Sequence, residues 1–143
     1  MRSFVCACRG IWAAVKTERN MRIHLAAVYY IILVCILFGF AAYETALAAL
    51  ACGLVIGAEL LNTALERLCD GLEPGRSPLV KTVKDLAAGA VLVCAAAAVT
   101  VAAALLWRRG GFLPDLLRHP AVWAGAAAAP FWFWFVFGFG GKK

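Results

Sequence analysis

Three long apolar segments set what this chain can fold into. They run from Leu25 to Tyr43, from Thr45 to about Leu68, and from Leu86 to Trp107. A helix of about 20 apolar residues crosses the ~30 Å hydrocarbon core of a bilayer, so each segment is long enough to span it. Of the 143 residues, 64% are hydrophobic, whereas soluble domains contain about 45–50% apolar residues. The sequence therefore predicts an all-α integral membrane protein with three transmembrane helices.

Two further segments flank these spans. Residues 3–23 alternate apolar and basic side chains, which predicts an amphipathic helix on the membrane surface. Within it, Glu18 and Arg22 are four residues apart, a spacing that favours an exposed ion pair. Residues 121–141 are again apolar and contain Pro130 and a run of aromatic residues. They favour a fourth apolar helix that returns across the membrane. The alternative is an aromatic anchor that lies at the membrane interface.

Gly and Pro residues mark the connections between the apolar segments. Residues 71–78 carry the strongest loop signal, and residues 110–120 form a second loop. These connections suggest a membrane core at residues 1–107. A C-terminal extension at residues 108–143 would follow it.

The basic residues are concentrated beside the apolar segments and give a net charge of +6. Such clusters usually face the cytoplasm and its anionic lipid. We therefore expect a multi-pass protein of the inner (cytoplasmic) membrane, with its functional site facing the cytoplasm. Little soluble surface remains for binding nucleic acid, so we discount that role. The clusters are Arg2, Arg9, Lys16, Arg19 and Arg22, and Arg67, Arg76, Lys81 and Lys84; Arg108 and Arg109 depart from the trend on the outer side.

The second apolar segment carries an unusual polar face. At 100° per residue, Glu59, Asn62, Glu66 and Asp70 fall within roughly 80° of one another on a helix. Carboxylates in a membrane segment are costly and call for a partner such as a metal, a cation or a proton-transfer role. The alternative is a polar packing face satisfied by neighbouring helices.

Other polar groups are expected at the same membrane level. Glu18 precedes the first span, and Lys84 and Asp85 open the third. Carboxylates with a Lys, and without a His or Cys ligand set, suit Mg²⁺ and phosphate rather than zinc. Phosphoryl transfer needs a metal on the phosphates, a cation for the developing charge and a carboxylate base. The expected depth points to a lipid hydroxyl as the nucleophile, and no P-loop or protein-kinase glycine motif is present.

Three sequence blocks resemble the prokaryotic diacylglycerol kinase family. Residues 18–25 read ERNMRIHL, residues 59–66 read ELLNTALE and are followed by Asp70, and residues 81–91 read KTVKDLAAGAV. The order and gaps of the blocks also fit, and the resemblance covers about residues 4–107. The first and third blocks are closer to the Gram-positive branch, which phosphorylates undecaprenol.

The resemblance implies a homotrimer with active sites shared between subunits, each chain having a surface helix and three transmembrane helices. It implies ATP and Mg²⁺ as cofactors and a lipid alcohol as substrate, with undecaprenol favoured over diacylglycerol. Glu59 would act as general base and Asn62 would orient the reacting groups. Glu18 and Glu66 would hold Mg²⁺ together with ATP. Lys84 and Asp85 would contact ATP.

Two departures from the family pattern bear on these expectations. Ser77-Pro78 stands where the family often has His-Pro, which puts nucleotide contacts from residues 75–77 in doubt. The tail after Trp107 has no counterpart in the three-helix core. Two other functions remain open from the residues: a noncatalytic membrane assembly protein that uses the polar face for helix association, and, less favoured, an ion or proton pathway.

Overall fold

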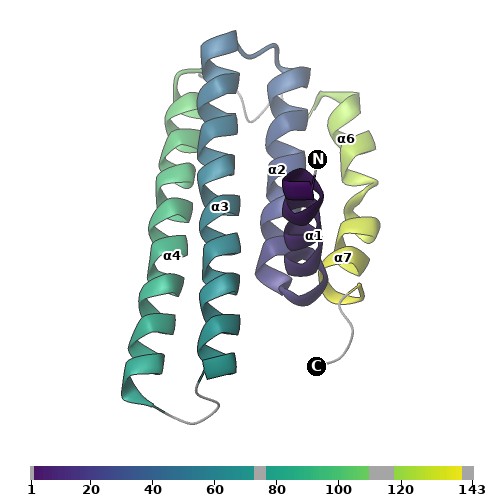
Figure 1. Cartoon of the computed structure of the whole chain (residues 1–143). Helices are drawn as coiled ribbons and strands as arrows, with labels where there is room; N and C mark the ends of the chain where they lie inside the picture. Colours follow the sequence, from purple (N-terminus) through teal and green to yellow (C-terminus); the bar gives the residue numbers. More distant parts are fainter. Residues whose placement is uncertain (1, 73–76, 110–117, 140–143) are drawn as a thin grey trace.

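The computed structural model describes residues 2–72, 77–109 and 118–139, and this part of the chain is helical without strands. Helices α2, α3 and α4 stand side by side, with α3 between the other two (Figure 1). Helix α1 packs against α2 and α3, and α6 and α7 follow one another along α2. The helices are α1 (Arg2–Thr17), α2 (Arg19–Leu37), α3 (Ala42–Leu72), α4 (Pro78–Trp107), α6 (Pro120–Ala126) and α7 (Ala129–Phe137).

The three predicted membrane spans are confirmed as helices. Within the described ranges, α2, α3 and α4 are the helices long and apolar enough to cross a membrane. They alternate in direction, so the bundle has two distinct ends (Figure 1). At one end, which we call the junction end, α1 leads into α2 and α3 leads into α4. Helix α7 also ends there. At the opposite end, the turn end, α2 turns into α3.

The predicted surface helix is present but shorter than expected. Helix α1 ends at Thr17, and Glu18 adopts extended backbone angles, φ −101° and ψ 118°, before α2 begins at Arg19. Residues 19–23 therefore belong to the first span, and the prediction of one helix over residues 3–23 is wrong there. The reason is the side-chain environment, since Met21 and Arg22 are 0% and 5% exposed in the interior.

The fourth apolar helix is present as two short pieces. Helix α6 has 7 residues and α7 has 9, and a turn at Ala127–Ala128 separates them. Pro130 lies in the first turn of α7, where its missing N–H is tolerated, but within a continuous helix its ring would clash with the preceding turn. Residues 140–143, at the end of the predicted span, lie outside the described ranges, as do 73–76 and 110–117 of the predicted loops.

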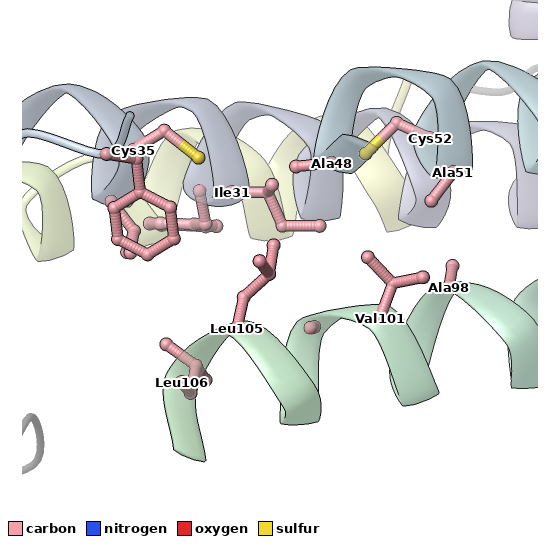
Figure 2. A pocket seen from close by; sticks show the side chains of 13 residues that line it. Ile31, Cys35, Ala48, Ala51, Cys52, Ala98, Val101, Leu105 and Leu106 are labelled. Carbon is pink, nitrogen blue, oxygen red and sulfur yellow. The ribbon is translucent and has the colours of Figure 1, made fainter. Parts of the chain in front are cut away.

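The interior divides between the two ends of the bundle. A cluster of Ala14, Val15 and Met21 fills the junction end. At the turn end, Cys35, Ala48 and Leu105 form a second cluster. Side chains of α2, α3 and α4 face one another there across an apolar cavity of about 260 Å³ (Figure 2). Its walls are almost entirely apolar, made of aliphatic side chains, two thiols and the rings of Tyr30 and Phe40, so it suits an apolar occupant rather than polar chemistry.

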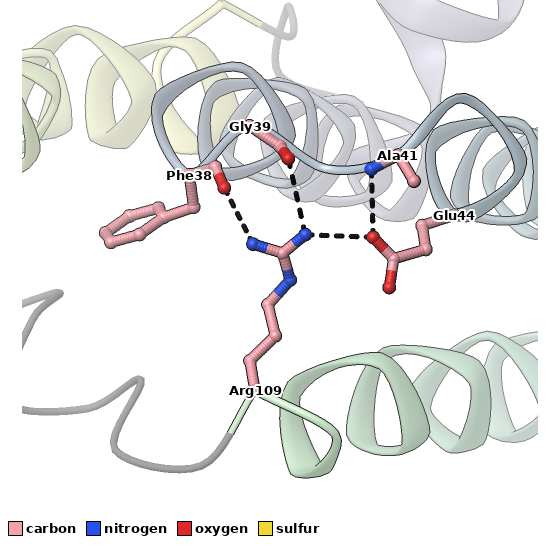
Figure 3. Close-up of polar contacts among 5 residues, drawn as sticks. All are labelled: Phe38, Gly39, Ala41, Glu44 and Arg109. Carbon is pink, nitrogen blue, oxygen red and sulfur yellow. Dashed lines mark hydrogen bonds and ion pairs between the residues drawn. The ribbon is translucent and has the colours of Figure 1, made fainter.

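An ion pair closes the turn end. The Arg109 guanidinium lies 2.9 Å from Oε2 of Glu44 and donates hydrogen bonds to the carbonyls of Phe38 and Gly39 at 2.7 and 3.4 Å (Figure 3). Glu44 also accepts the N–H of Ala41 at 2.9 Å. Glu44 therefore neutralises Arg109 within the described part of the chain.

Candidate active site

The polar face of α3 lies near the junction end of the bundle. Helix α3 has buried side chains at Val55, Glu59 and Thr63. These three residues form a stripe that faces the neighbouring helices. Asn62 and Glu66 are half-buried beside the stripe, and Asp70 is exposed further along. The face thus runs from a buried carboxylate to one in contact with solvent.

Glu59 is the most enclosed acidic group of the site, with 2% of its surface exposed. Its Oε1 lies 3.1 Å from Nε2 of His24 on α2. A buried carboxylate without a partner is strongly destabilising, so the imidazole accounts for how Glu59 is accommodated. Sequence reasoning missed His24. Its place in the block at residues 18–25, close to Glu18 in the sequence, was the available signal.

Asn62 is joined to Glu66 one helical turn further along. Its Nδ2 donates a hydrogen bond to Oε1 of Glu66 at 3.0 Å. This bond holds one Glu66 oxygen and fixes the orientation of the amide. The Asn62 Oδ1 atom is buried and has no hydrogen-bond partner. An unsatisfied buried acceptor of this kind is available to a ligand.

Glu18 joins these groups from the α1–α2 junction. It is half-buried, and its carboxylate, like that of Glu66, is within electrostatic range of Glu59. The expected Glu18–Arg22 ion pair is wrong. Arg22 is buried and donates to backbone carbonyls instead. The Glu18 carboxylate makes no hydrogen bond or ion pair with the rest of the described chain, so it is free to bind a ligand.

Lys84 and Asp85 at the start of α4 differ in their surroundings. Lys84 Nζ pairs with Oδ1 of Asp70 and is within electrostatic range of Glu66, so it belongs to the site. Asp85 is exposed, and nothing in the described ranges bonds to its carboxylate. Ser77 is half-buried and directly precedes α4, whereas residues 75 and 76 lie outside the described ranges.

Comparison with known proteins identifies the family. The family model for prokaryotic diacylglycerol kinase matches residues 5–106. The chain belongs to the prokaryotic diacylglycerol kinase family. It is 42% identical over 94 residues to the undecaprenol kinase of Bacillus subtilis, a match covering 66% of this chain and 76% of the relative. It is 44% identical over 117 residues to a diacylglycerol kinase of Synechocystis, covering 80% of this chain and 63% of the relative. No solved structure matches.

Membership of this family makes the chain a membrane lipid kinase, as the sequence blocks predicted. The matched range stops at residue 106, close to the end of α4. Helices α6 and α7 therefore lie outside the part that the family model covers. The division into a core at residues 1–107 and an extension at 108–143 stays a prediction.

The oxygen atoms of this lipid kinase site fit Mg²⁺. In the described ranges no three His, Cys, Asp or Glu side chains are grouped as a metal site. Mg²⁺ typically takes one or two protein carboxylates and completes its shell with phosphate oxygens and water. Glu18 and Glu66 would supply that pair, and the unpartnered Oδ1 of Asn62 is a further hard donor beside them. The donor set thus suits a metal that arrives with a nucleotide.

Proposed function

We propose that this lipid kinase transfers the γ-phosphate of ATP to the hydroxyl of a membrane lipid alcohol, with undecaprenol favoured over diacylglycerol. The observation that carries the proposal is the buried Glu59, held by His24 among the oxygen donors Glu18, Asn62 and Glu66. The proposed nucleophile is an alcohol because such a carboxylate can accept a hydroxyl proton.

Each residue then has a distinct task. Glu59 takes the proton from the lipid hydroxyl as that oxygen attacks the γ-phosphorus, and the bond from the γ-phosphorus to the β–γ bridging oxygen breaks to release ADP. Asn62 orients Glu66 through its 3.0 Å hydrogen bond. Mg²⁺, held by Glu18 and Glu66, would neutralise charge on the phosphates of ATP. Lys84 and Asp85 would contact ATP, with Lys84 moving between Asp70 and the phosphates.

The preference for undecaprenol rests on the block at residues 18–25, which is closer to the Gram-positive branch. Identity to the two curated relatives is similar, at 42% over 94 residues for the undecaprenol kinase and 44% over 117 residues for the diacylglycerol kinase, so the choice is made on that block. Phosphorylation of a carrier lipid would take place on the cytoplasmic face of the inner membrane, where ATP is available.

We also propose a homotrimer with shared active sites. Six leucines leave one side of α3 exposed in the single chain, and a partner helix would cover them as well as lipid would. They are Leu47, Leu50, Leu54, Leu61, Leu65 and Leu68. A noncatalytic assembly role disagrees with the family assignment and is not proposed further.

The test is reconstitution of the full chain in liposomes with Mg²⁺-ATP and either undecaprenol or diacylglycerol. We expect phosphorylation of undecaprenol at a kcat/KM at least about tenfold above that for diacylglycerol, equivalent to ~1.4 kcal/mol of discrimination. Faster turnover of diacylglycerol would overturn the preference. Turnover of neither lipid by intact trimers would overturn the proposed reaction.

A further inference from the structure

The C-terminal extension ends against the junction of α1 and α2. Phe135 and Phe139 pack against the cluster of Ala14, Val15 and Met21. The ring of Trp12 on α1 lies 5.9 Å from that of Phe139, and the guanidinium of Arg19 lies 5.9 Å above the ring of Phe137. Aromatic side chains of the last described residues thus contact both helices that flank Glu18.

Arg22 connects the same three helices by hydrogen bonds. Its Nη1 donates to the carbonyls of Val15 and Lys16 at 3.0 and 3.2 Å, and its Nε donates to the carbonyl of Val136 at 3.1 Å. All three carbonyls belong to the last turn of a helix, α1 or α7, where no intrahelical donor is available. One buried guanidinium therefore caps two helix C-termini, whose dipoles favour a cation.

Glu18 depends on this arrangement for its position. It is the single residue between α1 and α2, and its own carboxylate has no partner within the described ranges. Its direction therefore follows from the angle between the two helices. That angle is held by Arg22, by the aromatic contacts of α7 and Phe139, and by the 2.7 Å hydrogen bond that Arg67 on α3 donates to Oγ1 of Thr17.

We propose that α7 is a positioning element of the active site, which holds the α1–α2 junction through Arg22 and so fixes the Glu18 carboxylate. Arg22 and Phe139 act through Glu18 and touch no substrate. The inference rests on the proposed role of Glu18 toward Mg²⁺. It assigns to the extension a part in catalysis that the family match, which ends at residue 106, does not include.

The test compares Phe139→Ala with Phe133→Ala in the full chain. Phe133 is on the same segment but is 68% exposed, and its ring contact is to Phe137 and not to α1 or α2, so its loss leaves the Trp12–Phe139 and Arg22–Val136 contacts in place. Hydrogen exchange of α1 amides reports on the junction without needing activity. We expect Phe139→Ala to speed exchange in α1 roughly tenfold and to leave α3 and α4 unchanged.

A second readout is the Mg²⁺ requirement of lipid phosphorylation. In Phe139→Ala the Mg²⁺ concentration for half-maximal rate should rise about fivefold, with a smaller change in the KM for lipid. Arg22→Lys, which keeps the charge but loses the fork of donors, should change both readouts in the same direction.

The two readouts separate failure of this inference from failure of the proposed function. Equal α1 exchange in the two Phe variants would overturn the positioning role, whatever the activity. Faster α1 exchange with an unchanged Mg²⁺ requirement would also overturn it, because Glu18 would then not depend on the junction. Absence of any Mg²⁺-ATP turnover in the unaltered chain would instead count against the proposed reaction.

Discussion

At the scale of single residues, the site depends on how a buried acid is kept in place. Glu59 has 2% of its surface exposed, yet a histidine nitrogen from another helix lies 3.1 Å from it. In the proposed reaction, this enclosure would keep water from competing with the lipid hydroxyl for the carboxylate. The contact to His24 ties the orientation of that carboxylate to the packing of α2 on α3.

Replacement of Glu59 by Gln tests the general base. Gln has nearly the same shape and still bonds to His24, but it cannot accept the hydroxyl proton, so we expect kcat to fall at least about a hundredfold. Oligomeric state and nucleotide binding should be unchanged, and both can be measured in detergent. A variant that turned over normally would remove Glu59 from the reaction; one that lost its oligomeric state would assign the residue to assembly.

Two substitutions of His24 separate its possible contributions. His24→Ala removes the partner of Glu59, and we expect kcat to fall about tenfold because the carboxylate loses its fixed orientation. His24→Gln keeps an N–H donor on a side chain of similar reach and should recover much of that loss. Steady-state kinetics of both variants measures the difference. Equal activity of the two would show that the contact at 3.1 Å is not used.

At the scale of helices, the sequence predicted the type of each element better than the residues at which it begins and ends. Hydropathy placed α2, α3 and α4 because spanning a bilayer leaves few alternatives to an apolar helix. It did not find the break at Glu18, because the cause is the burial of Arg22 against α7, far away in the sequence. Pro130 indicated that the extension would be divided into two helices. The sequence did not predict on which side of the proline the second helix would begin.

The ion pair at the turn end joins Arg109, which lies just after α4, to α3 and to the turn before it. Its removal tests how much this connection stabilises the protein. Arg109→Ala leaves Glu44 without its cation and removes the hydrogen bond to the carbonyl of Phe38, so we expect the midpoint of thermal unfolding to fall by about 5 °C. The neighbouring Arg108→Ala is the matched control and should change little, since its side chain is exposed. Lipid phosphorylation should persist at low temperature, because the active site is at the other end of the bundle.

At the scale of the whole molecule, the alternation of helices fixes which ends share a compartment. Helix α4 finishes at the turn end and α7 finishes at the junction end (Figure 1). If the junction end faces the cytoplasm, the end of α7 does so as well. Residues 140–143 lie outside the described ranges, so Phe137, the last residue of α7, is the position at which this side can be tested.

Cysteine labelling tests this topology in intact cells, in a background where the exposed Cys6 and Cys8 are replaced by Ala. Trp107→Cys and Phe137→Cys place thiols at exposed positions, 89% and 58% exposed in the single chain, at opposite ends. A membrane-impermeant maleimide should label the Trp107→Cys variant and spare Phe137→Cys until the cells are broken. The reverse pattern would invert the orientation of the whole bundle.

The sequence predicted which residues belong to the candidate site, but not which of them bond to one another. Helical periodicity placed Glu59, Asn62 and Glu66 on one face, since their spacing is a property of a single helix. The partners of that face come from other helices, and a single sequence gives no distance between His24 and Glu59. Asp85 shows the opposite failure: it neighbours Lys84 in the sequence, but its side chain is exposed and makes no contact with the groups that Lys84 joins in the described part of the chain.

The cap that Arg22 provides also has a consequence for the order of synthesis. Its hydrogen-bond partner Val136 is 114 residues further along the chain. At about 5–20 residues per second, a ribosome delivers that carbonyl roughly ten seconds after the guanidinium has emerged. During this interval the first two helices exist without the last one, and the charged group at their junction is incompletely bonded. The newly made kinase should therefore acquire its final Glu18 geometry only after Val136 has been synthesised.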